Sequence, residues 1–199
     1  MRTAAAAFVF LVGCGGDGRA TVDPTTPDLE RVRIAVGHED PTVLTLAGAW
    51  LSDDGTSGHG VDAEATLAAA PPLVVKGDRS SWDFKKRTMR FEGNVQATRA
   101  AVTMTCDAIE VSYEGERITT AMASGTVVVT QGERIARGER ATLTADDGRI
   151  VLQGSPSIND GPNTLVGDRI VLYLDDERLE CQACRLEVVG SAVAPVRDP

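Results

Sequence analysis

Apolar and polar residues alternate with a period of two along most of the chain between about residues 30 and 190. In 106–118, CDAIEVSYEGERI, the side chains of Ile109, Val111 and Tyr113 share one parity, and 167–179, GDRIVLYLDDERL, repeats the arrangement. Strict alternation is typical of half-buried β-strands, and no convincing helix signal follows residue 15. The pattern therefore predicts a dozen or more short strands joined by tight turns.

The two segments belong to a longer internal repeat. One offset of 61 positions, from Asp107 to Asp168, also relates glycines, charges and apolar residues of equal parity without a gap. It maps Gly77 to Gly138, Arg79 to Arg140, Met89 to Ile150, Phe91 to Leu152 and Gly93 to Gly154. This agreement predicts a duplicated hairpin unit. We expect a degenerate third copy at 44–67, in which DAEATL takes the place of CDAIEV, after a first strand at 29–36.

Inside each repeat unit, the apolar residues change from one set of alternating positions to the other. Val102 and Met104 occupy one parity, whereas Ile109 and Val111 occupy the other. A bulge or bend near Asp107 would let both halves face one interior, and the second copy repeats the change. We therefore expect a sheet folded over an apolar interior, with unpaired edges at its ends.

Acidic clusters and histidines are the candidates for other chemistry. The clusters at 53–55, 146–148 and 174–177 lack the ligand spacing of a calcium loop and recur where hairpins turn, so turn chemistry is favoured. His59 is a possible metal ligand with nearby aspartates, but its glycine-rich surroundings favour a solvated turn. With His38 as the other histidine, we expect no enzyme, metal or cofactor.

The N-terminus has the features of an export signal. A positive start precedes the apolar run 4–12, which is too short to span a bilayer. The run ends in LVGC, which resembles a bacterial lipobox and implies cleavage at 1–13 and a lipid on Cys14; an ordinary signal peptide with an incidental cysteine is the alternative. Residues 14–29 have the composition of a flexible tether, 30–190 form the folded domain and 191–199 a tail.

Composition narrows the partners. The net charge is −9 and the basic residues are scattered, which excludes the basic stripe that a nucleic acid needs. If Cys14 carries lipid, Cys106, Cys181 and Cys184 remain. They can form a structural disulfide, whose pairing the sequence leaves open, or stay as buried thiols. A redox or zinc role for CQAC is disfavoured, because residues three apart on a strand point to opposite faces.

Several motifs together resemble a known family. GDR and FEGNV at 77–95, DAIEV and EGERI at 107–118, and GDRIVLYLDDERL resemble the OstA-like domain of the LptA and LptC lipopolysaccharide-transport proteins. The resemblance implies a V-shaped β-jellyroll that holds the acyl chains of lipopolysaccharide and pairs end to end with like domains. A lipobox departs from both family patterns, so the membrane that holds the anchor, inner or outer, stays open.

These expectations combine into one hypothesis: a periplasm-facing lipoprotein, tethered to a membrane, that serves lipopolysaccharide export as an LptC-like or LptA-like component. No phosphate-binding loop is present, so an ATP-driven inner-membrane exporter would supply the energy. The alternative is an envelope scaffold that associates by its edges, as a homo-oligomer, without lipid. Apolar residues at strand parity are core residues first, and the resemblance makes them candidates to line a lipid groove: Trp82, Phe84, Met89, Phe91, Val111, Tyr113, Leu143, Ile150, Leu152, Leu172 and Leu174.

Overall fold

The computed structural model describes residues 27–36, 42–68, 71–115, 117–144, 148–161, 163–174 and 178–188. They form one antiparallel sheet of fourteen strands, which confirms the predicted all-β class and the expected number of strands. The bounds are β1 Leu29–Val36, β2 Thr42–Leu51, β3 Ser57–Leu67, β4 Leu73–Asp83, β5 Thr88–Arg99, β6 Val102–Glu114, β7 Arg117–Gln131, β8 Arg134–Thr144, β9 Arg149–Gln153, β10 Ser157–Asp160, β11 Asn163–Val166, β12 Arg169–Tyr173, β13 Leu179–Gln182 and β14 Arg185–Val188. Cys14, His38 and the tail 191–199 lie outside the described residues.

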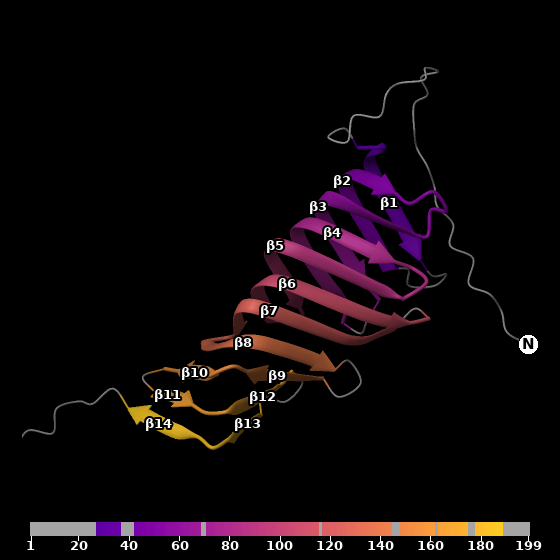
Figure 1. Cartoon of the computed structure of the whole chain (residues 1–199). Helices are drawn as coiled ribbons and strands as arrows, with labels where there is room; N and C mark the ends of the chain where they lie inside the picture. The colour runs from indigo at the N-terminus through magenta and orange to yellow at the C-terminus, as the bar shows by residue number, and fades with distance from the viewer. Residues whose placement is uncertain are drawn as a thin grey trace, which may run out of the picture.

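The sheet is an elongated stack of hairpins. Figure 1 shows β1 to β8 following one another in chain order, after which the sheet divides into β10, β11 and β14 on one side and β9, β12 and β13 on the other. Strands β1 to β8 each pair with the next. Several reach ten residues or more, longer than expected, because pairing continues through the bend instead of ending there.

A line of bends folds the sheet along its length. The pairing register shifts between Lys76 and Arg79 in β4, and corresponding shifts occur in β5, β6 and β7. In β6 the shift lies between Thr105 and Ala108, where the parity change predicts it. After β8 the bend becomes a break, since β8 pairs with both β9 and β10. This geometry gives the folded-over sheet expected from the sequence.

The bend divides the strands into two walls that face each other. Wall 1 comprises 32–36, 42–45, 63–67, 73–76, 95–99, 102–105, 127–131 and 134–137 with β10, β11 and β14. Wall 2 comprises 48–51, 57–61, 79–83, 88–92, 108–114, 117–124 and 140–144 with β9, β12 and β13. Inward side chains of both walls form one hydrophobic cluster.

An acid and a glycine shape each bend. Asp107 Oδ2 accepts a hydrogen bond of 3.2 Å from the backbone N–H of Thr126. The preceding Gly125 has φ +90°, a conformation that side chains disfavour, and a Cβ there would collide with the Asp107 carboxylate. The arrangement recurs in other layers as Asp78 with Gly93 and Glu139 with Gly154. The repeat in sequence is thus a repeat of the bend.

The alignment of the degenerate third copy is wrong. Asp62 in β3 was expected to match Asp107 in β6, yet β3 crosses the bend in the opposite direction to β6, since consecutive strands are antiparallel. Asp62 has φ +49° and so occupies the left-handed position that Gly125 takes in β7. The similarity of DAEATL to CDAIEV does not reveal this difference, because apolar alternation is the same in either chain direction.

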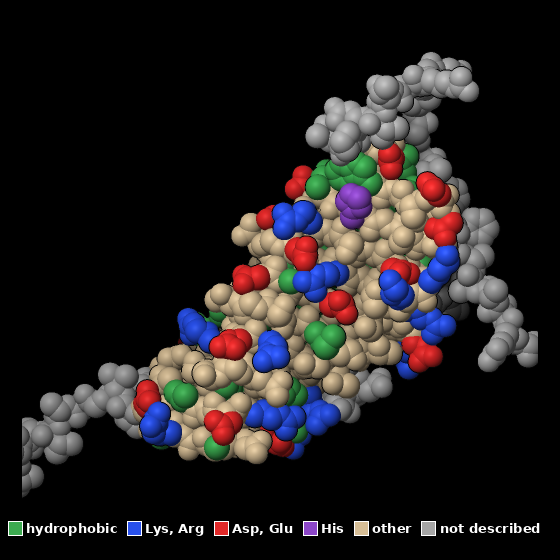
Figure 2. Space-filling view, viewed as in Figure 1, with side chains coloured by type: hydrophobic (Ala, Val, Ile, Leu, Met, Phe, Trp, Pro, Cys, Tyr) green, Lys and Arg blue, Asp and Glu red, His purple; other side chains and the backbone are tan. Residues whose placement is uncertain are grey.

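Charged side chains are spread over the outer face of the sheet (Figure 2). Figure 2 shows Lys or Arg and Asp or Glu side chains interspersed over the visible face. Examples are the ion pairs of Lys76 with Glu64 at 2.9 Å and of Arg90 with Glu92 at 2.8 Å. Nothing in the part of the chain described forms a helix long and apolar enough to cross a membrane.

Candidate functional site

The interior between the walls is the candidate site, because it gathers the apolar residues that the sequence singled out. Trp82, Met89, Phe91, Val111, Leu143, Ile150, Leu152 and Leu172 are buried. Phe84, Tyr113 and Leu174 are partly buried and pack against the same cluster. The structure therefore brings all these side chains together, and their contact with lipid stays a prediction.

All of those candidates belong to one side of the interior, on wall 2 or the turns at its rim. The opposite side, on wall 1, is equally apolar and was missed as a candidate lining. Its fully buried members include Leu44, Leu67, Val75, Val95, Val127 and Val129. Alternation at 127–131 and the parity change could have identified this second lining from the sequence.

An apolar pocket of about 320 Å³ opens at the end of the interior near β13 and β14. Ile158, Leu165 and Leu186 line it from wall 1, and Leu179 lines it from wall 2. Arg134 and Asn163 also line it. The Leu186 side chain is 57% exposed, so the pocket meets solvent. An apolar cavity between two apolar walls suits a hydrocarbon ligand.

Three buried polar atoms lie on wall 2, in β4 and β6. Ser80 Oγ, Trp82 Nε1 and Tyr113 Oη make no hydrogen bond within the described residues. Ser80 is only 4% exposed and Trp82 only 3%. Burial raises the pKa of the Tyr113 hydroxyl, and the charge of Asp83 adds to this, so the group stays neutral.

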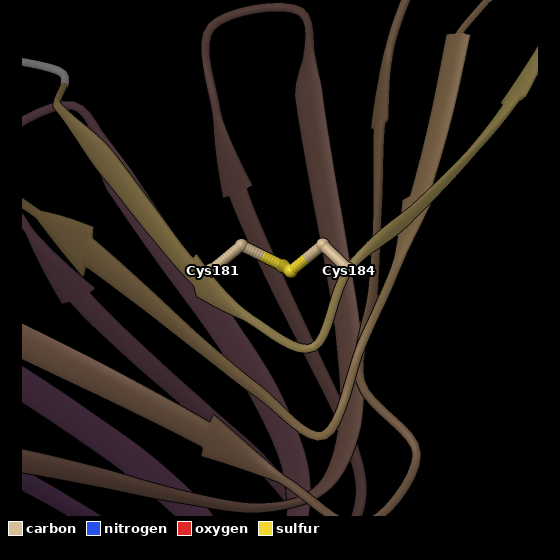
Figure 3. Close-up of a disulfide and its surroundings, with 2 residues drawn as sticks. All are labelled: Cys181 and Cys184. Carbon is tan, nitrogen blue, oxygen red and sulfur yellow. A yellow bond between two sulfur atoms is a disulfide. The ribbon is translucent and has the colours of Figure 1, made fainter.

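The cysteines occupy two different places. Cys181 of β13 and Cys184, the residue just before β14, form a disulfide with their Cα atoms 5.9 Å apart (Figure 3). The break between the two strands turns the chain, so the opposite-face argument from one continuous strand does not apply there. Cys106 is a free thiol, buried on the inner side of β6. Burial, with the charge of Asp107, raises its pKa to about 11.

The histidine and one acidic cluster have structural partners. His59 lies on β3, not in the turn expected for it, and its ring stacks on Trp50 of β2 with the ring centroids 5.0 Å apart. Asp54 accepts hydrogen bonds from Lys85, Thr56 and Ser52. The Lys85 hydrogen bond is the main reason why the pKa of Asp54 falls well below its ordinary value. Asp54 therefore orders the β2–β3 turn. Within the described residues, no three histidine, cysteine or acidic side chains lie together as a metal site would need.

Comparisons with known proteins agree with this architecture. Residues 74–178, which cover most of β4 to β12, match the family model described as LptA/(LptD N-terminal domain) LPS transport protein. Among solved structures, the chain is similar to LptH of Pseudomonas aeruginosa, described as the LptA homologous periplasmic component of the conserved lipopolysaccharide transport device. The identity is 15%, the TM-score is 0.53, and the match covers 60% of this chain and 96% of that chain. No curated protein matches the chain significantly.

Proposed function

The chain belongs to the LptA/(LptD N-terminal domain) family of LPS transport proteins, and on this basis we propose that it binds lipopolysaccharide through the acyl chains, as an LptA-like or LptC-like component of export. The observation that carries the proposal is an apolar interior with two linings that continues to an open pocket at Leu186. A family of transport proteins also agrees with the expectation that the chain is not an enzyme.

Physical chemistry supports an apolar channel for this task. Removing one methylene of an acyl chain from water is worth about 0.8 kcal/mol, so a lipid that crosses an aqueous compartment needs a continuous apolar lining. The walls supply that lining, while the charged outer face keeps the protein in water. The exposed Leu186 side chain gives an acyl chain a first apolar contact at the pocket.

The test compares two exposed apolar residues. The full chain and its Leu186→Asp and Met122→Asp variants are exported in a lipopolysaccharide-producing host, purified, and analysed for bound lipid by mass spectrometry. Leu186 lines the pocket, whereas Met122 lies on the outer side of β7 and is 48% exposed. We expect stoichiometric lipid A with the parent chain, at least a tenfold loss with Leu186→Asp and no change with Met122→Asp.

The outcome separates transport from scaffolding. A folded parent chain that carries no lipid would contradict the proposal and favour an envelope scaffold. Equal lipid loss in both variants would show that the pocket is not the binding place.

We also propose that Cys14 carries the lipid anchor and that the domain faces the periplasm. The support is the LVGC motif after an apolar run, and the residues concerned lie outside those that the structure describes. Metabolic labelling with a palmitate analogue should mark the parent chain and not Cys14→Ser. Separation of inner and outer membranes then identifies the membrane that holds the anchor. Label on the Cys14→Ser chain would overturn the assignment.

End-to-end pairing with like domains completes the proposal. β1 pairs only with β2, β13 only with β12 and β14 only with β11 among the described strands. Both ends of the molecule thus present strand edges that another domain can extend by adding a strand. In such an array the interiors would join into one path, and an ATP-driven exporter in the inner membrane would load it with lipid.

A further inference from the structure

The two copies of the repeat differ in one systematic way inside the apolar interior. Each polar residue with a buried, unpaired atom in the first copy has an apolar counterpart 61 positions later. Ser80 corresponds to Ala141, Trp82 to Leu143 and Tyr113 to Leu174. Ala141 and Leu143 are buried, and Leu174 packs against the core. The shared fold therefore does not require polar groups at these places.

The three polar residues lie on wall 2, Ser80 and Trp82 on β4 and Tyr113 on β6, with β5 between the two strands. Ser80 and Trp82 are two residues apart on β4, so both point to the interior from wall 2. Tyr113 lies on β6, and its backbone N–H donates a 3.1 Å hydrogen bond to the carbonyl oxygen of Arg87 in the β4–β5 turn. Trp82 and Tyr113 thus lie near the same turn, at the rim of wall 2.

Leaving such groups unpaired lowers stability. A buried donor or acceptor without a partner loses its hydrogen bonds to water and gains nothing in return. Among the described residues, Ser80 is the one polar or charged residue counted as buried. Trp82, two positions along the same strand, belongs to the apolar cluster. A ligand site that is mainly apolar uses a few such polar groups to fix the orientation of its ligand.

The chemistry of the atoms defines the ligand. An indole N–H only donates, and hydroxyl groups both donate and accept, so a ligand that pairs with all three must offer acceptor oxygens. A plain hydrocarbon chain has none. Resting on the proposed function, we propose that the first copy offers polar contacts along wall 2 for oxygen atoms carried on acyl chains, as hydroxyls or esters, while the second copy holds plain hydrocarbon.

The experiment compares three probes on the full chain. Tetradecanoic acid, 3-hydroxytetradecanoic acid and 3-acetoxytetradecanoic acid compete with a fluorescent fatty acid, each below its micelle concentration. The three share a carboxylate and a main chain, and the last two separate a hydroxyl from an ester. We expect one oxygenated probe to bind about tenfold more tightly than the plain acid, which is the effect of one or two added hydrogen bonds.

Substitutions test which side chains cause the preference for an oxygenated probe over tetradecanoic acid. Ser80→Ala, Trp82→Phe and Tyr113→Phe should each lower, several-fold, the ratio of the affinity for the oxygenated probe to the affinity for tetradecanoic acid. Two matched control variants, Ser81→Ala and Tyr173→Phe, should keep the preference for the oxygenated probe. The Ser81 side chain is exposed on the same strand, and the Tyr173 hydroxyl donates a hydrogen bond to Glu180.

Stability of the unliganded chain gives a second readout. Ser80→Ala and Tyr113→Phe should raise the denaturation midpoint, because each removes an unpaired polar group and leaves no new one. A lower midpoint would mean that the hydroxyls already stabilise the free protein, and would overturn the proposed polar contacts.

Failure of the proposed polar contacts differs from failure of the proposed function. If the three probes bind equally and the variants change nothing, the polar contacts are wrong while lipid binding stands. If no probe binds and the full chain also lacks lipid A, the proposed function fails with it.

Discussion

Individual glycines decide where the sheet folds. Gly125 combines φ +90° with a Cβ direction that points at the Asp107 carboxylate, so two separate effects exclude a side chain there. Gly132, in the β7–β8 turn, has φ +59° and open space where a Cβ would stand. Backbone strain is therefore common to the two positions, and the collision is specific to Gly125.

Gly125→Ala should lower the free energy of unfolding by about 3 kcal/mol or more, and Gly132→Ala by only about 1 kcal/mol. Urea denaturation measures both. A double variant, Gly125→Ala with Asp107→Ala, should recover part of the loss, because it removes the atom that collides. Equal effects at the two glycines would contradict the role of the Asp107 contact.

The buried thiol of Cys106 makes stability depend on alkaline pH. Its pKa rises from an ordinary 9.0 to about 11, because burial disfavours the thiolate and Asp107 repels it. The native state therefore holds the proton more tightly than the unfolded state does. The contribution to stability is complete below pH 9.0 and falls as the pH rises from 9.0 to about 11.

The measurement is the denaturation midpoint of the parent chain and of Cys106→Ala between pH 8 and 11. We expect the difference between the two midpoints to narrow as the pH increases. A constant difference would show that the thiol does not titrate differently in the two states. Native-state alkylation at pH 8 should also be slow, since the thiol is buried and protonated.

At the scale of elements, the last two strands are held differently from the others. β13 and β14 are four residues each, and the disulfide spans the break between them. It lies against Gly167, where a Cβ would come within 2.9 Å of both sulfur atoms. Ala183 between the strands has φ +52° without being glycine. The cross-link thus takes over the role that a glycine and an acid have in earlier bends.

Replacing both cysteines, Cys181→Ser with Cys184→Ser, should cost about 2 kcal/mol for so short a loop. Hydrogen exchange should show faster amide exchange in β11, β13 and β14, and unchanged protection in β4 and β5. A Cys106→Ser variant leaves the disulfide intact and serves as the control. Uniform loss of protection along the whole sheet would contradict a local role.

At the scale of the whole molecule, the two ends are open edges of one continuous sheet. If molecules assemble end to end through these edges, the sedimentation coefficient should rise with protein concentration. A synthetic peptide with the β1 sequence LERVRIAV should compete for the opposite edge and reduce the apparent mass, because it adds a strand where a neighbour would. A scrambled peptide of the same composition is the control.

Equal effects of the two peptides, or a monomer at all concentrations, would contradict assembly by strand addition. The lipid experiment is independent of this result, since binding depends on the interior and assembly depends on the edges.

The amino-acid sequence by itself determined the class of fold, the repeat and the bend. Alternation with a period of two marks strands whatever their neighbours, and a parity change at Asp107 has few solutions other than a bulge. The matched family and the β-jellyroll followed from the same motifs. These features are local along the chain, so sequence suffices to identify them.

Other features depended on which strands meet, and only the tertiary structure decided them. Wall 1 became a lining because folding placed it opposite Phe91 and its neighbours, and the pocket at Leu186 exists because the two walls end together there. The direction of β3 corrected the third copy, and the break after β13 brought Cys181 to Cys184. The sequence pattern does not reveal the direction of a strand or the wall to which it belongs, because apolar residues alternate with a period of two in every case.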